Sequence, residues 1–191
     1  MVDHSVIEAT AEFDAFCKAR AWRYCFIGGI ALQRWGEQRA TRDADMTLLV
    51  GWGNEAPFVD EMLAHFEPRL PDARQHALRH RVLLLRHPNK TPLDVGLGGL
   101  PFEEHTIERA SYFRLTEKYG YTTCSPEDLV VHKVFAGRPQ DWVDVRSVLV
   151  RQGAGLDFDL IEEELTPLLD LLEMPERLIK LKKLRDSLCT Q

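Results

Sequence analysis

The sequence lacks the features of secreted, zinc-binding and membrane-spanning proteins. Its four cysteines are scattered along 191 residues without a C-x-x-C pair, which argues against a zinc site or a disulfide framework. No apolar run reaches the length needed to cross a bilayer. The N-terminus, Met1-Val2-Asp3-His4, has neither the basic nor the apolar region of a signal peptide. We therefore expect a cytoplasmic protein with reduced thiols.

The chain also lacks an excess of positive charge. A formal net charge of −6 argues against a general nucleic-acid coat protein. Basic residues are nevertheless concentrated in one stretch, which contains Arg69, Arg74, Arg79, Arg81, Arg86 and Lys90. A face formed by these residues would bind a phosphate backbone, whereas a solvated surface is the alternative interpretation. The histidines of this stretch are interpreted as surface residues, and they are His76, His80 and His87.

The chain has the length of one domain, or of two small ones that share a core. Apolar spacing and turn residues predict helices over residues 5–22, 30–35 and 57–66, and strands over residues 24–27, 45–50, 81–85, 92–96 and 121–123. A capped start at Ser125-Pro126-Glu127-Asp128 opens a pattern that is helical to Leu188. We therefore expect an α+β fold, with a mixed sheet flanked by helices over residues 1–115 and a helical region over residues 116–191.

Two neighbouring glycines and an Asp-x-Asp pair are the most informative residues. Gly28 and Gly29 end the apolar run Tyr24-Cys25-Phe26-Ile27 and precede a predicted helix. Asp43 and Asp45 begin the next strand, and residues two apart on a strand point to the same side. Two carboxylates on one face repel each other unless a cation lies between them, and a glycine turn at a helix N-terminus suits a phosphate. The pattern therefore predicts a divalent metal and a nucleotide.

A third carboxylate, Asp94, lies in the apolar-acid-apolar sequence Leu93-Asp94-Val95, on the expected second strand of a hairpin. Burying an unpaired carboxylate is expensive, so an aspartate flanked by strand formers needs a specific partner. If this strand lies beside residues 43–50, three carboxylates converge at one sheet edge, which suits two-metal phosphoryl chemistry. The alternative interpretation is that Asp94 is a turn residue after Pro92.

Together these residues resemble the catalytic core of the nucleotidyltransferase superfamily related to DNA polymerase beta. The order is Gly28-Gly29, a helix, Arg39-x-Thr41-x-Asp43-x-Asp45, and then a strand with a single aspartate. The Arg-x-Thr-x-Asp-x-Asp motif is most similar to that of the AbiEii/AbiGii-type nucleotidyltransferases. These proteins are the toxin halves of bacterial toxin–antitoxin and abortive-infection systems. Ser125 to Lys133 and Arg138-x-x-Asp141-x-x-Asp144 resemble the helical part of those proteins. The resemblance covers roughly residues 22–150, and members of the toxin branch are often considerably longer.

The resemblance implies an Mg²⁺- or Mn²⁺-dependent enzyme that moves a nucleoside monophosphate from an NTP to an acceptor hydroxyl and releases pyrophosphate. Its implied catalytic and metal-binding residues are Asp43, Asp45 and Asp94. The expected nucleotide-binding residues are Gly28, Gly29, Arg39, Thr41, Lys133 and Asp141. On spacing alone, Lys133 is equally an ordinary helix lysine, with Asp141 as its structural support. The implied acceptor is RNA, in particular tRNA, or a protein, and the implied partner is an antitoxin.

Two other functions fit the same motif. One is a small-molecule nucleotidyltransferase that adenylylates an aminoglycoside or a lincosamide, because an acidic surface suits a cationic drug whereas the basic stretch over residues 69–90 suits RNA. The other is a nucleotide-binding or antitoxin-like module without catalysis, and the presence of all three carboxylates counts against it. Trp52, which follows the Asp-x-Asp strand, is the candidate for stacking on a nucleobase.

Overall fold

The computed structural model describes residues 3–189, which form two compact units. The first unit comprises residues 3–30 and 39–124, and the second comprises residues 31–38 and 125–189. Each unit has buried apolar side chains of its own. The expected division into domains at residues 115/116 stays a prediction.

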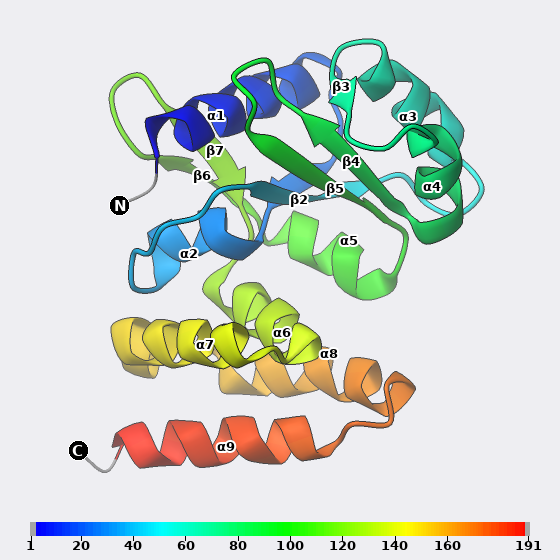
Figure 1. Cartoon of the computed structure of the whole chain (residues 1–191). Coiled ribbons are helices and arrows are strands. Elements are labelled where there is room, and N and C mark those ends of the chain that lie inside the picture. Colours follow the sequence, from blue (N-terminus) through cyan, green and yellow to red (C-terminus); the bar gives the residue numbers. More distant parts are fainter. Residues whose placement is uncertain (1–2, 190–191) are drawn as a thin grey trace. The chain divides into compact units, whose positions relative to one another are not determined.

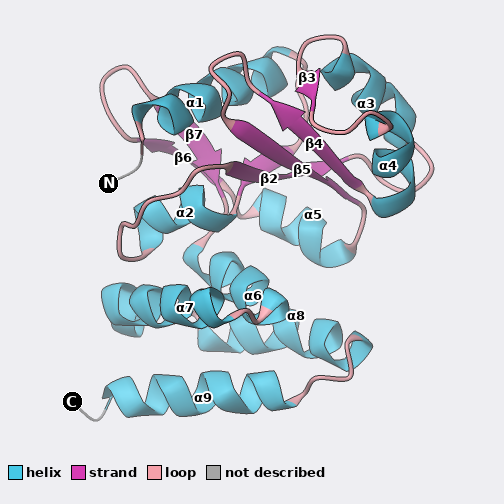
Figure 2. Ribbon diagram, viewed as in Figure 1, coloured by secondary structure: helices cyan, strands magenta, loops and turns pink. Residues whose placement is uncertain are grey.

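A seven-stranded mixed sheet forms the centre of the first unit (Figure 1, Figure 2). Its strands lie in the order β3-β4-β5-β2-β1-β7-β6. Their bounds are β1 Tyr24–Phe26, β2 Ala44–Leu49, β3 Glu67–Pro68, β4 Val82–Arg86, β5 Pro92–Gly98, β6 Ser111–Arg114 and β7 Gly120–Thr123. The pairs β2/β5 and β1/β7 are parallel, and the other pairs are antiparallel. The strand that follows Asp43 therefore lies in the middle of the sheet, with β5 as a direct neighbour.

The two faces of this sheet differ. The helices of the first unit, besides the start of α2, are α1 His4–Ala19, α3 Glu55–Leu63, α4 Ala73–His80 and α5 Pro101–Glu108. Apolar side chains of α1, α3 and α4 share one core with Leu93, Val95 and Leu97 of β5. Asp94 alternates with these residues, so it points to the opposite face. Helix α5 lies on that opposite face, since a Cβ on Gly98 would contact Glu103 of α5.

The first predicted helix, over residues 5–22, is confirmed as α1. The two glycines, however, do not form the expected turn. Helix α1 begins after Asp3, whose carboxylate accepts a hydrogen bond from Ser5 N at 3.0 Å. The glycines are the first residues of helix α2 (Gly28–Trp35) rather than a separate turn before it. Gly28 has a φ of +56°, a left-handed value that glycine adopts without steric cost. The chain therefore reverses from β1 into α2 at Gly28 itself.

The predicted hairpin is also confirmed, because β4 and β5 pair antiparallel. The sequence patterns do not predict β3, β6, α4 or α5. Helix α4 buries only Ala73 and Ala77, and the side chains of β6 are exposed or half-buried, so neither has a strong apolar pattern. The interpretation of His87 as a surface residue is wrong. Its ring is buried, and Nε2 lies 2.9 Å from Glu12 Oε2.

The second unit is helical. Its elements are the later residues of α2, then α6 Pro126–Ala136, α7 Pro139–Gln152, a short 3-10 helix η1 Gly153–Gly155, α8 Phe158–Leu171 and α9 Glu176–Cys189. Helix α6 starts as predicted, because Ser125 Oγ accepts a hydrogen bond from Asp128 N at 3.1 Å. Side chains from α6, α7 and α8, such as Leu129, Val148 and Ile161, are fully buried.

The predicted α+β fold, with a mixed sheet, flanking helices and a helical C-terminal region, is confirmed. Over residues 3–189 no helix combines the length and the apolar character that a membrane span requires.

Candidate active site

The two glycines lie against the residues that flank the start of β2. A Cβ atom on Gly28 would clash with the carboxylate of Asp45, and one on Gly29 would clash with the hydroxyl of Thr41. A larger residue at either position would therefore push a candidate site residue out of place. The first turn of α2 lies directly beside Asp45, and the unpaired backbone N–H groups of a helix N-terminus favour a negatively charged ligand.

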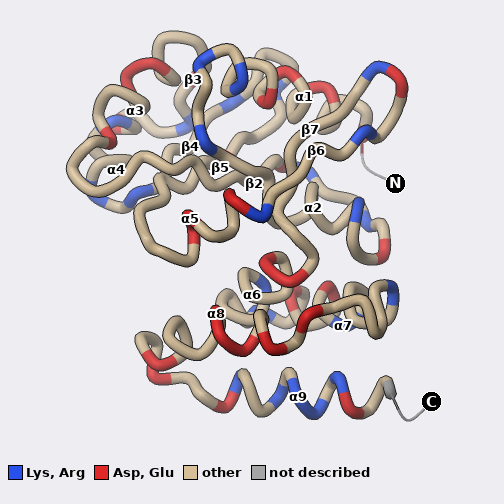
Figure 3. Tube along the Cα trace, turned by 180° about the vertical axis from the view of Figure 1, so that it is seen from behind, with Lys and Arg blue, Asp and Glu red and all other residues tan. Residues whose placement is uncertain are grey.

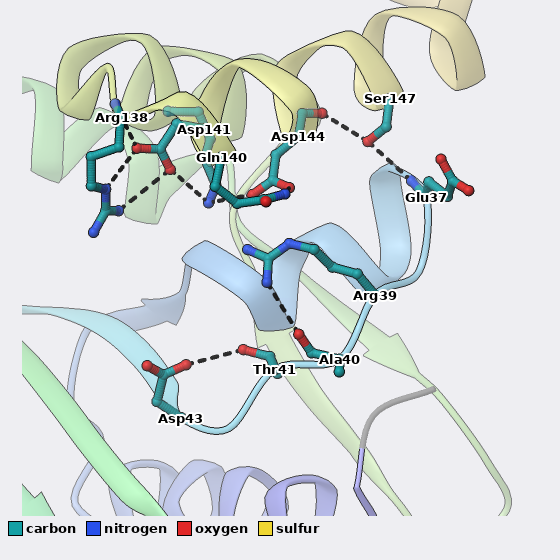
Figure 4. A network of polar contacts seen from close by, with 11 residues as sticks. Glu37, Arg39, Ala40, Thr41, Asp43, Arg138, Gln140, Asp141, Asp144 and Ser147 are labelled. Atoms are coloured by element: carbon teal, nitrogen blue, oxygen red, sulfur yellow. Dashed lines mark hydrogen bonds and ion pairs between the residues drawn. The ribbon is translucent and has the colours of Figure 1, made fainter.

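Asp43 lies one residue before β2 and is held by Thr41. The Thr41 hydroxyl donates to Asp43 Oδ1 at 3.0 Å (Figure 4). Thr41 is buried, and Arg39 donates through Nη1 to the carbonyl oxygen of Ala40 at 3.1 Å. The Thr-x-Asp part of the motif thus forms a local arrangement in which Thr41 fixes the orientation of Asp43.

Asp94 lies opposite Asp45 on the neighbouring parallel strand, since the register of β2 and β5 pairs these two residues. Neighbouring strands lie about 4.8 Å apart, so the two side chains leave the same face of the sheet side by side. The interpretation of Asp94 as a turn residue is wrong, because it lies within β5. The structure therefore brings Asp43, Asp45 and Asp94 to the same end of the two central strands, next to Gly28.

The charge of Asp94 is influenced by its surroundings in three ways. Burial raises the pKa of Asp94 above its ordinary value, the Arg69 guanidinium opposes that rise, and the negative charge of Asp43 adds to it. Arg69 Nη2 lies 2.7 Å from Asp94 Oδ1. The sequence indicates Arg69 only as a member of the basic stretch over residues 69–90, because its closeness to Asp94 depends on strand order rather than on local spacing.

The three carboxylates suit a divalent metal by chemistry, because carboxylate oxygens are the ligands that Mg²⁺ prefers. Among residues 3–189, no group of three or more His, Cys, Asp or Glu side chains is arranged as a ready-made metal site. Thr41 binds one oxygen of Asp43, and Arg69 pairs with one oxygen of Asp94. The metal-binding role of Asp43, Asp45 and Asp94 therefore stays a prediction.

A buried ion-pair cluster lies at the start of α7 in the second unit (Figure 4). Lys133 Nζ lies 3.1 Å from Asp141 Oδ1 and 2.8 Å from Asp144 Oδ2. Arg138 Nε donates to Asp141 Oδ2 at 2.7 Å, and Gln140 Nε2 donates to Asp144 Oδ1 at 3.0 Å. Burial raises the pKa of Asp141, but the hydrogen bonds from Arg138 and Lys133 outweigh burial, so its pKa lies below the ordinary value.

This cluster gives Lys133 and Asp141 partners within the second unit. Lys133 is 6% exposed and lies between two carboxylates that are themselves buried. Each buried charge at the junction of α6 and α7 is thus compensated by an opposite charge beside it. The predicted contact of Lys133 and Asp141 with a nucleotide stays a prediction.

Trp52 does not lie near the carboxylates. It follows β2 at the end opposite to Asp43, and a strand rises about 3.3 Å per residue. Its side chain is 66% exposed, Nε1 donates to Gly99 O at 2.9 Å, and the Arg81 guanidinium lies 4.1 Å from the ring centroid. The expectation that Trp52 stacks on the base of a bound nucleotide is therefore wrong for a nucleotide held at Asp45.

Comparison with protein-family models decides the family. The model described as "Nucleotidyl transferase AbiEii toxin, Type IV TA system" matches residues 18–171, which is more than half of the chain. The chain belongs to the AbiEii nucleotidyltransferase family. As an AbiEii-family nucleotidyltransferase it has an NTP as substrate, and the family belongs to toxin–antitoxin systems. The resemblance seen in the sequence is confirmed.

Solved structures support the fold of this AbiEii-family chain. An antigenic nucleotidyltransferase-like protein from Paracoccidioides brasiliensis aligns with a TM-score of 0.57 and 15% identity, over 97% of this chain and 94% of that one. The lincosamide antibiotic adenylyltransferase LnuA, bound to lincomycin, aligns with a TM-score of 0.50 and 13% identity, over 77% of this chain and 96% of that one. No curated protein sequence matches significantly. At these identities the likeness establishes a nucleotidyltransferase-like fold.

Proposed function

We propose that this AbiEii-family chain transfers a nucleoside monophosphate from an NTP to the hydroxyl of an RNA acceptor, in particular tRNA, with Mg²⁺ or Mn²⁺ as the metal. The observation that carries the proposal is the row of carboxylates beside the glycine-led helix. Asp45 and Asp94 are register partners on parallel strands, Asp43 precedes Asp45 by two residues, and Gly28 contacts Asp45. Arrangements of this kind serve phosphoryl transfer through positioning and charge stabilisation.

The glycines and the residues after α2 are proposed to hold the nucleotide. Gly28 and Gly29 let the side chains of Asp45 and Thr41 lie against the first turn of α2. The first backbone N–H groups of α2 and the helix dipole favour a negatively charged phosphate there. Thr41 holds Asp43 in place, and Arg39, two residues before Thr41, has the charge to meet the triphosphate. These groups would bind and orient the NTP before the acceptor reacts.

Asp43 and Asp45, with Asp94 beside them, would hold the metal. When bound, Mg²⁺ or Mn²⁺ neutralises the triphosphate and polarises its oxygens. The acceptor oxygen attacks the α-phosphorus, the bond from that phosphorus to the bridging oxygen breaks, and pyrophosphate leaves with the electron pair. Asp94 takes up the proton of the acceptor hydroxyl. Burial beside Asp43 raises the pKa of Asp94, which favours its acting as a base.

A direct test identifies both donor and acceptor. The purified protein is incubated with Mg²⁺, each α-labelled NTP in turn, and one acceptor: total RNA, a lincosamide, an aminoglycoside, or the protein alone. Label in RNA is the expected result. Label on a drug supports the small-molecule alternative, and label on the protein indicates self-modification. No transfer from any NTP would mean that the chain is a binding module without catalysis.

The carboxylate substitution Asp43→Asn ties any observed transfer to the site. We expect it to reduce transfer by about 100-fold or more, the scale seen when a group that stabilises transition-state charge is removed. The matched control is Asp60→Asn, because Asp60 is an exposed aspartate on α3 that pairs with Arg74. Full activity of Asp43→Asn would exclude the site from catalysis.

A further inference from the structure

We propose that Arg69 binds a backbone phosphate of the nucleic-acid acceptor while it orients Asp94. The inference rests on the nucleotidyl transfer proposed above and specifies which side of the site receives the acceptor. Arg69 follows β3, outside the residues that the sequence motif contains. It is the cation that lies against the third carboxylate.

Strand order places Arg69 in one row with the carboxylates. Asp45 of β2 pairs with Asp94 of β5, and Asp94 pairs with Leu84 of β4. Arg69 N donates to Leu84 O at 3.0 Å, which adds Arg69 as the next position beyond β4. The row therefore runs from Asp45 to Arg69 across the sheet. Anything that approaches Asp94 from the β3–β4 side meets the Arg69 guanidinium.

The Arg69 side chain has hydrogen-bonding capacity left over. Its Nη2 pairs with Asp94 Oδ1 at 2.7 Å, and no other side-chain partner of Arg69 lies among residues 3–189. The contact is a charge pairing without hydrogen-bond alignment, because Asp94 Oδ1 has no aligned donor. A guanidinium carries five N–H donors, and the Arg69 side chain is 22% exposed. Arg69 therefore keeps N–H groups that Asp94 does not use, directly beside a candidate catalytic acid.

The neighbouring basic residues extend this side of the sheet. Figure 3 shows Lys and Arg positions (blue) along the β3–β4 part of the first unit. Arg86 lies on the same face as Leu84, two residues further along β4, and donates to Glu67 Oε1 at 3.1 Å. Arg86 and Arg69 are each paired with one carboxylate, but the partner of Arg86 is the surface residue Glu67, whereas the partner of Arg69 is Asp94. That position beside a candidate catalytic carboxylate selects Arg69 as the residue that contacts the acceptor.

The chemistry of Arg69 favours one class of acceptor. A guanidinium fork matches the oxygens of a phosphate, and an RNA chain carries a phosphate one sugar away from its terminal hydroxyl. The hydroxyl would lie at Asp94 and the phosphate at Arg69. A cationic aminoglycoside would instead meet a like charge at this position, which is destabilising. A protein acceptor has no phosphate in its backbone, so it would not supply this contact at a fixed distance from the reacting hydroxyl.

The experiment compares Arg69→Met and Arg69→Lys with the control Arg74→Met. Arg74 is exposed and paired with Asp60 on the surface, so its loss tests a general charge effect. The acceptor is a short single-stranded RNA with a free 3′-hydroxyl. The measurements are the KM for RNA, the KM for NTP, and the salt dependence of RNA binding by fluorescence anisotropy without NTP.

We expect Arg69→Met to raise the KM for RNA by about tenfold, the loss of one charge-assisted hydrogen bond, with the KM for NTP unchanged. The slope of log affinity against log salt should fall by about 0.7, the value for one single-strand phosphate contact. Arg69→Lys should restore part of the affinity, and Arg74→Met should behave as wild type. An unchanged salt slope for Arg69→Met overturns the proposal.

Different outcomes would overturn the role of Arg69 and the proposed nucleotidyl transfer. If wild-type protein labels only protein or a drug, nucleotidyl transfer stands and the assignment of Arg69 to an RNA phosphate is wrong. If wild-type protein transfers nothing to any acceptor, the proposed function itself fails, and the Arg69 proposal fails with it. Circular dichroism and thermal melting of each variant show whether a loss of binding comes from unfolding.

Discussion

At the scale of single residues, Gly28 is the most constrained position of the site. Its φ of +56° is a left-handed value, and its Cβ position is taken by the carboxylate of Asp45. A side chain at this position would strain the backbone and displace Asp45 at once. Glycine is therefore needed at position 28 for two separate reasons: the left-handed backbone angle and the close packing of Gly28 against Asp45.

Replacement of Gly28 by alanine should lower both stability and transfer activity. We expect the free energy of unfolding to fall by about 1–2 kcal/mol, the cost of placing a Cβ in the left-handed region. Urea denaturation and the labelled-NTP assay measure the two effects. Gly155→Ala is the control, because nothing lies near a Cβ at that position. Equal behaviour of Gly28→Ala and Gly155→Ala would contradict the close packing against Asp45.

Single residues also show how far the sequence predicts the site. The shared face of Asp43 and Asp45 follows from alternation along one strand, which is a local pattern. Asp94 joins them because β5 pairs with β2, and alternation alone does not predict that pairing. Arg69 is not predictable in this way, because its contact with Asp94 depends on β4 lying between β3 and β5. Trp52 follows β2 as the sequence indicates, but it lies at the end of that strand opposite to Asp43, so closeness in sequence does not bring it to the carboxylates.

At the scale of secondary-structure elements, the junction of α6 and α7 is held by the buried charges of Lys133, Asp141 and Asp144. An ion pair in the interior contributes little net stability, but removal of one partner leaves the other charges uncompensated. Lys133 lies between two carboxylates, so its loss removes a positive charge from beside both of them. The structural role of Lys133 can therefore be measured as a change in the free energy of unfolding.

Substitution of Lys133 by methionine should reduce the free energy of unfolding by about 3–5 kcal/mol. Chemical denaturation measures this change, with Lys183→Met as the control because Lys183 is exposed on α9. A Lys133→Met protein of wild-type stability that has lost NTP binding would contradict the structural role. It would favour the predicted phosphate contact instead.

The start of α6 offers a second element-scale prediction. Ser125 Oγ accepts from Asp128 N at 3.1 Å and donates to Asp128 Oδ2 at 2.8 Å. We expect Ser125→Ala to cost about 1 kcal/mol, as is usual for a lost helix N-cap. Ser187→Ala, on the exposed surface of α9, should leave the midpoint of urea denaturation unchanged. A neutral Ser125→Ala would show that the cap has no energetic role.

A helix or strand can be predicted from the sequence when its apolar residues form a clear pattern. The cap of α6 and the strands with buried alternate residues are readable from the sequence, because their signals are local and strong. Helix α4 is not, since it buries only Ala73 and Ala77 among polar neighbours. The burial of His87 is likewise set by α1, which supplies Glu12 from a distant part of the chain.

At the scale of the whole molecule, the lowered pKa of Asp141 links folding to pH. A carboxylate with a folded pKa below its ordinary value of 3.8 stabilises the folded state above that value. This contribution is lost as the pH falls from 3.8 through the folded pKa, because the carboxylate must then be protonated. The chain should therefore lose stability in that acidic window.

The contribution of Asp141 is measured by urea denaturation over a series of pH values on both sides of 3.8. We expect Asp141→Asn to be less stable at neutral pH and to lose less stability than wild type as the pH falls through this window. Asp159→Asn, an exposed change on α8, should follow the wild-type curve. An Asp141→Asn curve parallel to wild type throughout would contradict the linkage.

The central claim is that the carboxylates at the start of β2 and β5 perform nucleotidyl transfer. The measurement that tests it most directly is the release of pyrophosphate coupled to labelling of RNA, for wild type, Asp45→Asn and Asp94→Asn, with NTP binding measured in parallel. We expect both variants to remain folded and to lose transfer by about 100-fold or more. Transfer at the wild-type rate by folded Asp45→Asn and Asp94→Asn proteins would contradict it.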